Sequence, residues 1–331
     1  MKILVTAAGG GGAQSILKAL RMSGNEVIAV DGDALGAGLY MCDRGYLVPF
    51  ANKPDYVPRL LEICEKENVG VIFPGMDLEL PVLSKHRAEF AAAGVTVVVS
   101  DEAFVELCDD KLLTAGFLEQ HGFPFPKTWS LDEYAGEEPP FPVILKVRRG
   151  GARSQGIRVV RTAADLAAAR RDLDTKAYVM QELIDGTEYS CGTITFNGVC
   201  KGAIVLRRVL RDGDTYKAWV ERHPEMEAFV SKLATAMGGF GPLNVQLRVR
   251  EGVPYVFEFN ARCSGTTCFR ALAGFNEPQM IADYILNGTE PVHSIRPVTV
   301  LRYWNELVVE NEVIEACRQM QTVSGAVPPF A

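Results

Sequence analysis

The stretch LNVQLRVREGVPYVFEFNAR at residues 243–262 contains two strands of alternating polarity joined by a short link with a glycine. In the first strand, Leu243–Arg250, apolar residues stand at every second position, and the second strand, Tyr255–Asn260, also alternates. Because successive side chains of a strand point to opposite faces, each strand has one apolar and one polar face. The stretch predicts an antiparallel hairpin with one face in the core.

The polar face of this hairpin gathers one carboxylate and two amide side chains. If three residues form the loop, Gln246 lies opposite Glu258 and Asn244 lies opposite Asn260. Carboxylate and amide oxygens suit Mg²⁺, which takes one or two carboxylates and completes its shell with phosphate oxygens. The pattern favours a magnesium site over a merely solvated sheet face, with Arg262 close beside it.

The same register makes two structural predictions. It assigns Phe257 and Phe259 to the core face and Val256 to the polar face. It also excludes a two-residue turn with regular pairing, because such a turn would place the carboxylate and its partner amide on opposite faces. We therefore expect a three- or five-residue loop, or a bulge, within residues 250–255.

A second hairpin is predicted over Pro142–Arg161, with a glycine- and arginine-rich tip at Arg148–Gly156. Lys146 stands within its first strand, where a lysine either reaches toward water or neutralises a bound anion. Glycines let such a tip close over a ligand, while Arg149 and Ser154 would add charge and a hydrogen bond. From these residues alone, a solvated basic hairpin is an open alternative.

The segment Gln181–Ser190 reads as a strand that ends, turns at Asp185-Gly186 and resumes. A hinge of this kind offers backbone N–H and C=O groups to the edge of an adenine ring, and an acid a few residues on reaches ribose hydroxyls. An ordinary solvated turn is the alternative.

The first hundred residues alternate between strand and helix signals. Short buried strands separated by helices predict a doubly wound parallel sheet. The predicted strands are Ile3–Thr6, Val27–Val30, Val69–Phe73 and Val95–Val99, and the helices are Ala13–Met22, Val57–Lys66 and Leu83–Ala93. Later strand signals are mostly antiparallel, including Thr187–Phe196 and Gly202–Val209, with helices at Asp109–His121, Ala163–Asp172 and Glu225–Met237. From about residue 291 the pattern is less legible.

Gly9–Gly12 follow the first strand and Asp31 ends the second, which is the outline of a dinucleotide-binding fingerprint. The spacing departs from that fingerprint, because Gln14 or Ser15 stands where the third glycine is required. The run therefore favours a tight structural turn, or a small-anion site at a helix N-terminus, over an NAD site.

The bulk composition argues against several classes of protein. The 331 residues carry a net charge of −7, so the whole molecule is not built to hold nucleic acid. No apolar stretch approaches the ~18–20 residues of a membrane span, and the start MKILVTAAGG is too short and too soon interrupted for a signal peptide. Eight Cys and four His lack metal-ligand spacing and fit a reducing, cytoplasmic location.

Taken in order, these motifs resemble the ATP-grasp superfamily, and most of all stand-alone relatives of the carbamoyl phosphate synthase large subunit. The resemblance runs from residue 1 to about 290 and rests on Lys111 in DDK, Lys146 before the glycine-rich loop, Glu182-Leu-Ile with Glu188, Asn244-x-Gln246 and Glu258-x-Asn260-x-Arg262. It implies a pre-ATP-grasp α/β domain at 1–107, then a two-lobed ATP-grasp domain with mostly antiparallel sheets at 108–290. A small lid lobe would span about 122–180, and residues 291–331 would be a C-terminal extension.

The resemblance also implies roles for these residues. ATP would be held by Lys111, Lys146, Arg149, Ser154, Gly156, Glu182, Leu183, Ile184 and Glu188, with Arg148–Gly156 as a lid. Mg²⁺, or Mn²⁺ in its place, would be bound by Gln246, Glu258 and Asn260, and the catalytic residues would be Arg262 and Lys146. The first domain would line the site of the acyl substrate, which accounts for the glycine run without NAD.

The implied function is an ATP- and Mg²⁺-dependent carboxylate–amine ligase that acts on small molecules through an acyl phosphate. Carbamoyl phosphate synthases have a second arginine where this chain has Cys263–Thr267, which favours a carboxylate larger than bicarbonate. Arg207, Arg208 and Lys217 are candidate contacts for that carboxylate, with a solvated basic strand as the alternative.

Several alternatives are left open. They are a carbamoyl-phosphate-synthase-like enzyme that phosphorylates bicarbonate or carbamate, an NAD(P)-binding oxidoreductase, and a non-catalytic ATP-binding module. The sequence does not name the two substrates or a glutaminase partner, and a homo-oligomer is compatible with it.

Overall fold

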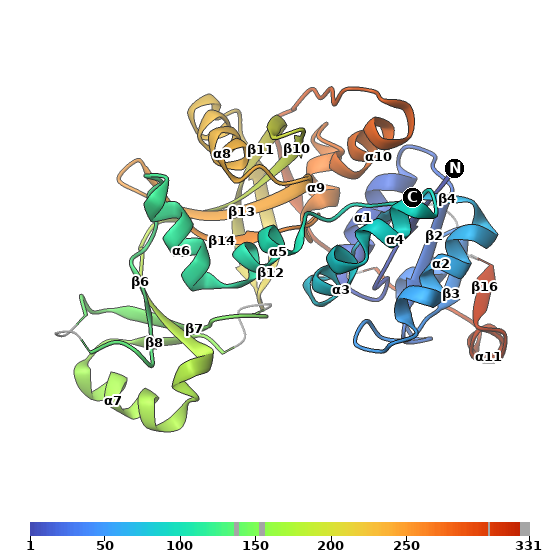
Figure 1. Ribbon diagram of the computed structural model, residues 1–331. Helices are drawn as coiled ribbons and strands as arrows, with labels where there is room; N and C mark the ends of the chain where they lie inside the picture. Colours follow the sequence, from blue (N-terminus) through green and yellow to red (C-terminus); the bar gives the residue numbers. More distant parts are fainter. Residues whose placement is uncertain (136–138, 152–155, 304, 325–331) are drawn as a thin grey trace.

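Three sheets carry the fold in the computed structural model, which describes residues 1–135, 139–151, 156–303 and 305–324 (Figure 1). The first sheet has the strand order β16-β3-β2-β1-β4-β5. Its parallel strands are β1 (Lys2–Val5), β2 (Val27–Asp31), β3 (Arg44–Leu47), β4 (Val69–Phe73) and β5 (Thr96–Val97), and β16 (Thr322–Ser324) is antiparallel to β3.

Helices cover both faces of the first sheet. Ile3 and Val5 of β1 pack in one core with α1 (Gly11–Arg21), and Leu4 packs in the other with α2 (Tyr56–Glu67). The continuous apolar run of β1 follows from this burial on both sides. The predicted doubly wound parallel sheet is confirmed.

Shorter helices complete this part of the chain. They are α3 (Leu80–Lys85), α4 (Arg87–Ala92), α5 (Glu102–Asp109) and the 3-10 turns η1 (Ala37–Tyr40) and η2 (Asp77–Glu79). The predicted helix Leu83–Ala93 is thus two helices that meet at His86. No helix among the described residues is long and apolar enough to cross a membrane.

The second sheet is antiparallel, with the order β14-β13-β10-β11-β12-β15. Its strands are β10 (Thr187–Phe196), β11 (Val199–Arg211), β12 (Asp214–Val220), β13 (Gly241–Arg250), β14 (Val253–Asn260) and β15 (Val298–Leu301). Helix α8 (Pro224–Met237) packs on β10 and β11, while α9 (Thr267–Leu272) and α10 (Glu277–Asn287) pack against α1.

The third sheet forms a smaller lobe that projects from the rest (Figure 1). Its order is β6-β9-β7-β8, and it comprises β6 (Thr128–Ser130), β7 (Val143–Val147), β8 (Arg158–Val160) and β9 (Tyr178–Glu182), with α7 (Ala163–Asp172) and η3 (Thr175–Ala177). Helix α6 (Lys111–Gln120) leads into this lobe. The predicted helix Asp109–His121 begins later, because Asp110 caps α6 by accepting a hydrogen bond from Leu112 N–H.

The β13–β14 hairpin has the predicted register but reaches it differently. Gln246 pairs with Glu258, and Asn244 pairs with Asn260. The turn at Glu251-Gly252 nevertheless has only two residues, because Arg250 pairs with Val253 and the register shifts later, next to Gln246. The expected irregularity is therefore a bulge outside residues 250–255.

This bulge corrects the assignment of two side chains. Val256 is fully buried opposite Leu247, whereas Phe257 is only partly buried and lines a cavity on the polar side. The prediction for Phe257 and Val256 was wrong because the extra residue of a bulge interrupts the alternation of side chains. Phe257 and Glu258, although consecutive, line the same cavity.

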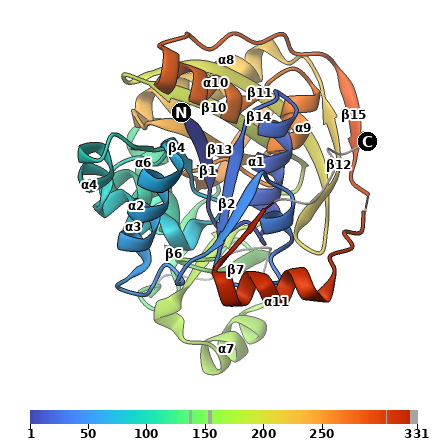
Figure 2. The ribbon, with the colours of Figure 1, turned by 90° about the vertical axis from the view of Figure 1, so that its right-hand side faces the viewer.

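The C-terminal segment joins two sheets. β15 pairs with β12 at the edge of the second sheet, and the chain then runs through α11 (Asn311–Met320) to β16 at the edge of the first (Figure 2). Cys317 and Val323 are buried there in a small cluster with Leu39 and Tyr40. The boundaries at 107 and 290 stay predictions.

The bulge can be tested with two aromatic residues of one strand. We expect Phe259→Ala to lower the free energy of unfolding by about 3–5 kcal/mol, because Phe259 is 2% exposed in the core. Phe257→Ala should lower it by clearly less, since that ring lines a cavity. Urea unfolding of both variants measures the difference, and equal losses would contradict the bulge.

Candidate active site

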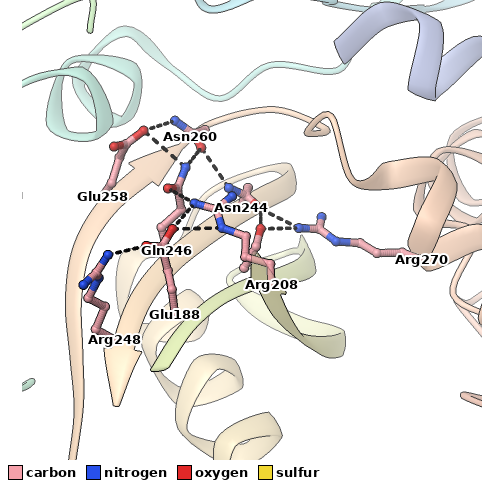
Figure 3. Close-up of polar contacts among 9 residues, drawn as sticks. Glu188, Arg208, Asn244, Gln246, Arg248, Glu258, Asn260 and Arg270 are labelled. Carbon is pink, nitrogen blue, oxygen red and sulfur yellow. Dashed lines mark hydrogen bonds and ion pairs between the residues drawn. The ribbon is translucent and has the colours of Figure 1, made fainter. Parts of the chain in front are cut away.

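Glu188 lies between two arginines on the polar face of the second sheet (Figure 3). Arg248 Nη2 donates to Glu188 Oε2 at 2.8 Å, and Arg208 donates to Oε1 from Nε at 3.0 Å and from Nη2 at 2.7 Å. Burial raises the pKa of this carboxyl, but Arg208 and then Arg248 outweigh burial and hold the pKa below its ordinary value. Glu188 therefore stays ionised at neutral pH.

Next to Glu188 and its two arginines, side-chain amides form a chain of hydrogen bonds that leads to Glu258. Gln246 Oε1 accepts a hydrogen bond from Arg208 Nη2 at 2.6 Å, and Gln246 Nε2 donates to Asn260 Oδ1 at 3.0 Å. Asn260 Nδ2 donates to Glu258 Oε1 at 3.0 Å. The predicted register thus brings the three proposed metal ligands into mutual contact.

A buried ion pair supports the far end of this chain. Arg270 Nη1 lies 3.0 Å from Glu277 Oε2, and both side chains are almost fully buried. Arg270 Nη2 donates to Asn244 Oδ1, and Asn244 Nδ2 donates to Asn260 Oδ1 at 2.8 Å (Figure 3). A Cβ at Gly192 would lie 2.4 Å from Arg270 Nη1, so any larger residue there would displace the guanidinium.

The first cavity, of about 220 Å³, lies between the second and third sheets. It is lined by the hinge residues Glu182, Leu183 and Ile184, and by Lys146 and Phe257. Lys146 Nζ donates to Gln181 Oε1 at 2.8 Å and lies 4.6 Å from the centroid of the Phe257 ring. Burial lowers the pKa of Lys146 to about 8, and the nearby charge of Lys111 acts in the same direction.

The second cavity, of about 460 Å³, lies between the glycine run and the second sheet, where Gly10–Gly12 and Arg262 line it. Arg262 Nη2 donates to Asp77 Oδ2 at 2.6 Å. Arg302, just after β15, also lines this cavity and donates from Nη2 to Gly265 O at 2.5 Å. It supplies a second arginine that the sequence did not reveal, because Arg302 is distant along the chain from Arg262.

The two cavities share part of their lining. Lys111, Arg208, Gln246 and Glu258 line both, so charged and amide groups stand where the cavities meet. Of these four, Arg208 is predicted from the sequence only as a candidate contact for the substrate carboxylate. A sequence signal existed for it, since the strand of Arg208 follows the strand of Glu188 directly along the chain, and the two pair as antiparallel neighbours.

Two predicted ATP contacts line neither cavity. Arg149 is bound by Asp110 at 2.8 Å and by Glu106 at 3.0 Å, so it fixes the base of the glycine-rich loop. Gly156 has a φ of +70° and lies against Val147, and both the positive φ and the close contact favour glycine at this position. Ser154 and the loop around it at 152–155 lie outside the described residues.

Asp31 is engaged by the turn that follows the first strand. Its Oδ2 accepts from Gly9 N–H at 2.7 Å, and its Oδ1 accepts from Asp33 N–H at 2.9 Å. A Cβ at Gly12 would lie 2.7 Å from Gly75 O. These contacts assign the glycine run and Asp31 to the packing of a tight turn that lines the second cavity.

The chemistry of the donor set fits a hard cation. The described residues contain no cluster of three or more His, Cys, Asp and Glu side chains that could hold a metal. A metal here would depend on one carboxylate, Glu258, on the amide oxygens of Gln246 and Asn260, and on oxygens from a ligand. Mg²⁺ is bound in this way when phosphates complete its shell.

Two family descriptions match the chain. Residues 3–98 match "PylC-like, N-terminal domain", and residues 174–307 match "ATP-grasp in the biosynthetic pathway with Ter operon". The chain belongs to the ATP-grasp superfamily. The predicted resemblance is confirmed by these matches, and the second of them contains Gln246, Glu258 and Asn260.

Curated and solved ATP-grasp relatives agree with this placement. The chain is 36% identical over 101 residues to N5-carboxyaminoimidazole ribonucleotide synthase of Synechocystis, covering 30% of this chain and 25% of that one. It is 25% identical over 205 residues to the carbamoyl phosphate synthase large chain of Thermomicrobium roseum, covering 55% of this chain and 19% of that one. It thus spans a quarter or less of these relatives.

Among solved structures, the N5-carboxyaminoimidazole synthetase of Staphylococcus aureus complexed with ADP superposes with a TM-score of 0.71 at 15% identity. The match covers 91% of this chain and 82% of that chain. It shows that the three sheets are arranged as in an ATP-grasp protein over nearly the whole chain.

The buried charge of Lys146 predicts a pH-dependent stability. Its pKa in the folded chain, about 8, lies below the ordinary value of 10.5, so the unfolded chain binds more protons between these values. Stability contributed by Lys146 therefore rises with pH across that window and is lowest below it. We expect Lys146→Met to be more stable than the wild type at pH 7, by an amount that shrinks from pH 8 to 10.5.

Urea unfolding at a series of pH values measures this difference. Lys176→Met, which removes an exposed lysine, controls for the loss of one positive charge. A stability difference for Lys146→Met that stays constant from pH 7 to 10.5 would show that Lys146 is not desolvated.

Proposed function

We propose that the chain is an ATP- and Mg²⁺-dependent carboxylate–amine ligase that works through an acyl phosphate. The observation that carries the proposal is the lining shared by the two cavities, where Lys111, Arg208, Gln246 and Glu258 stand together. A nucleotide in the first cavity and a carboxylate in the second would meet at this lining. Phosphoryl transfer needs such positioning and charge neutralisation more than covalent help from the protein.

The first cavity supplies the groups that a nucleotide needs. The hinge at Leu183 and Ile184 would hold the adenine edge through its backbone, and Glu188 would accept hydrogen bonds from the ribose. Lys146 would contact phosphate oxygens. Their negative charge would favour the protonated form of Lys146, which burial disfavours. The ADP in the Staphylococcus aureus relative is consistent with this use of the fold.

The lining shared by the cavities would hold Mg²⁺ through Gln246, Glu258 and Asn260. Bound there, the ion would neutralise charge on the phosphate oxygens of the nucleotide. Lys111 would add positive charge from the start of α6, and its backbone N–H donates to Arg148 O, which ties it to the base of the loop. Once the ion is bound, these groups would stabilise the charge that develops during transfer.

The proposed reaction has two steps. A carboxylate oxygen of the substrate bonds to the γ-phosphorus of ATP while the bond to the bridging oxygen breaks, and ADP leaves with that electron pair. The amine then attacks the acyl carbon, the carbon–oxygen bond to phosphate breaks, and the nitrogen loses a proton. Arg262, held by Asp77, would stabilise the negative charge on the acyl phosphate in the second cavity.

The second cavity favours a carboxylate larger than bicarbonate. Its volume of about 460 Å³ far exceeds the space of a bicarbonate ion, roughly two water molecules or ~60 Å³. Met76 and Leu78 offer apolar surface at this cavity, and Arg302 offers a second cation. A small molecule with a carboxylate and an apolar portion fits this lining.

Ligand-induced stabilisation tests the nucleotide assignment. We expect ATP with Mg²⁺ to raise the melting temperature and NAD⁺ to leave it unchanged, because a ligand that binds only the folded state stabilises it by mass action. Differential scanning fluorimetry with each ligand measures the effect. A shift with NAD⁺ and none with ATP would overturn the assignment.

A screen for ADP release tests the chemistry. ADP and phosphate should form in equal amounts only when a suitable carboxylate and amine are both present, and Lys146→Ala should lower the rate by on the order of 10²-fold. Lys176→Ala, at an exposed position, should keep the rate. Activity of Lys146→Ala within a few-fold of the wild type would show that Lys146 does not stabilise the transferred group.

A further inference from the structure

Two arginines set the direction of the amide chain next to Glu258. Arginine carries only N–H donors, so a side-chain amide that faces it must present its oxygen. Gln246 therefore turns Oε1 toward Arg208, and Asn244 turns Oδ1 toward Arg270 (Figure 3). The NH₂ groups of both amides then point toward Asn260.

This orientation leaves the amide oxygens engaged. Gln246 Oε1 holds Arg208 Nη2 at 2.6 Å, and Asn260 Oδ1 accepts from Asn244 and from Gln246. In these bonds Glu258 uses Oε1 alone. A cation that needs the oxygen of Gln246 must therefore compete with the guanidinium of Arg208.

We propose that Arg208 is a displaceable cation at the metal site, which holds the Gln246 oxygen until a divalent metal with nucleotide takes its place and releases it into the second cavity. The inference rests on the proposed function, because it needs a metal at Gln246 and Glu258. It adds a residue that is neither a metal ligand nor part of any motif of the resemblance.

The surroundings of Arg208 allow this exchange. The side chain is 9% exposed, yet it lines both cavities, so the second cavity is next to its present position. If Arg208 moves away, Glu188 is still paired with a positive charge, because Arg248 Nη2 donates to Glu188 Oε2 at 2.8 Å. A guanidinium and a divalent cation on one oxygen would repel each other, so binding of the cation weakens the hold of Arg208 on that oxygen.

Release of Arg208 would couple the two cavities. Metal and nucleotide in the first cavity would provide a free guanidinium to the second, where the carboxylate and then the acyl phosphate are negatively charged. By thermodynamic linkage, an anion in the second cavity would strengthen metal binding to the same degree. The chain would thus favour the metal–nucleotide complex most strongly when the acceptor is present.

The experiment is a titration with Mn²⁺ in saturating ADP, followed by the electron paramagnetic resonance signal of free Mn²⁺. Removing a competing charged hydrogen bond should tighten Mn²⁺ binding in Arg208→Met by on the order of 10-fold. Arg248→Met is the matched control: it removes the same charge and a bond to the same carboxylate, but the hydrogen bonds of Arg248 go to Ile184 O and Glu188 Oε2 rather than to the amide chain. We expect Arg248→Met not to tighten Mn²⁺ binding.

Unchanged or weaker Mn²⁺ binding by Arg208→Met would overturn the proposal. Equal tightening by Arg208→Met and Arg248→Met would also overturn it, because the loss of one positive charge would then account for the whole effect. Circular dichroism checks that Arg208→Met is folded; if it is not, Arg208→Gln keeps a donor for Glu188 and should tighten Mn²⁺ binding in the same direction. Failure of the wild type to bind Mn²⁺ with ADP would instead overturn the proposed function.

Discussion

One extra residue in β14 determines which side chains face the ligands. Val256 belongs to the core and Glu258 to the polar face, although two residues apart on a regular strand they would share a face. The bulge at Phe257 resolves this conflict and keeps Phe259 in the core. The amide chain, the contact of Lys146 with an aromatic ring and the shared lining of the two cavities all depend on it.

The buried ion pair between Arg270 and Glu277 supports the polar face, because Arg270 also donates to Asn244. Burying two charges is costly unless they are paired and further hydrogen-bonded, and such pairs add little net stability compared with apolar residues. Arg270 is paired with Glu277 and bonded to Ser190 and Asn244, which reduces that penalty. Its contribution is orientation, because a donor-only group in the core fixes which end of the Asn244 amide faces the site.

Much of the fold could be predicted from local pattern. Helix α7 and strand β10 have both predicted ends, since a capping residue, Thr162, or a clear alternation defines them. The pairing of Gln246 with Glu258 followed from parity. The position of the bulge did not, because a two-residue turn with a later bulge and a three-residue loop give the same register at Glu258. Arg302 was missed for another reason: contacts between distant segments leave no periodic signal in either one.

The C-terminal segment has a further consequence for motion. It leaves the second sheet at β15, places Arg302 in the second cavity and pairs with the first sheet through β16, so it is a tether between these two sheets. A hinge movement that separated these two sheets would have to stretch the tether or peel β16 from β3. The third sheet, entered through α6, is not spanned by that tether. Opening and closing should therefore be concentrated in the smaller lobe, while the wall around Arg262 and the glycine run keeps its shape through the catalytic cycle.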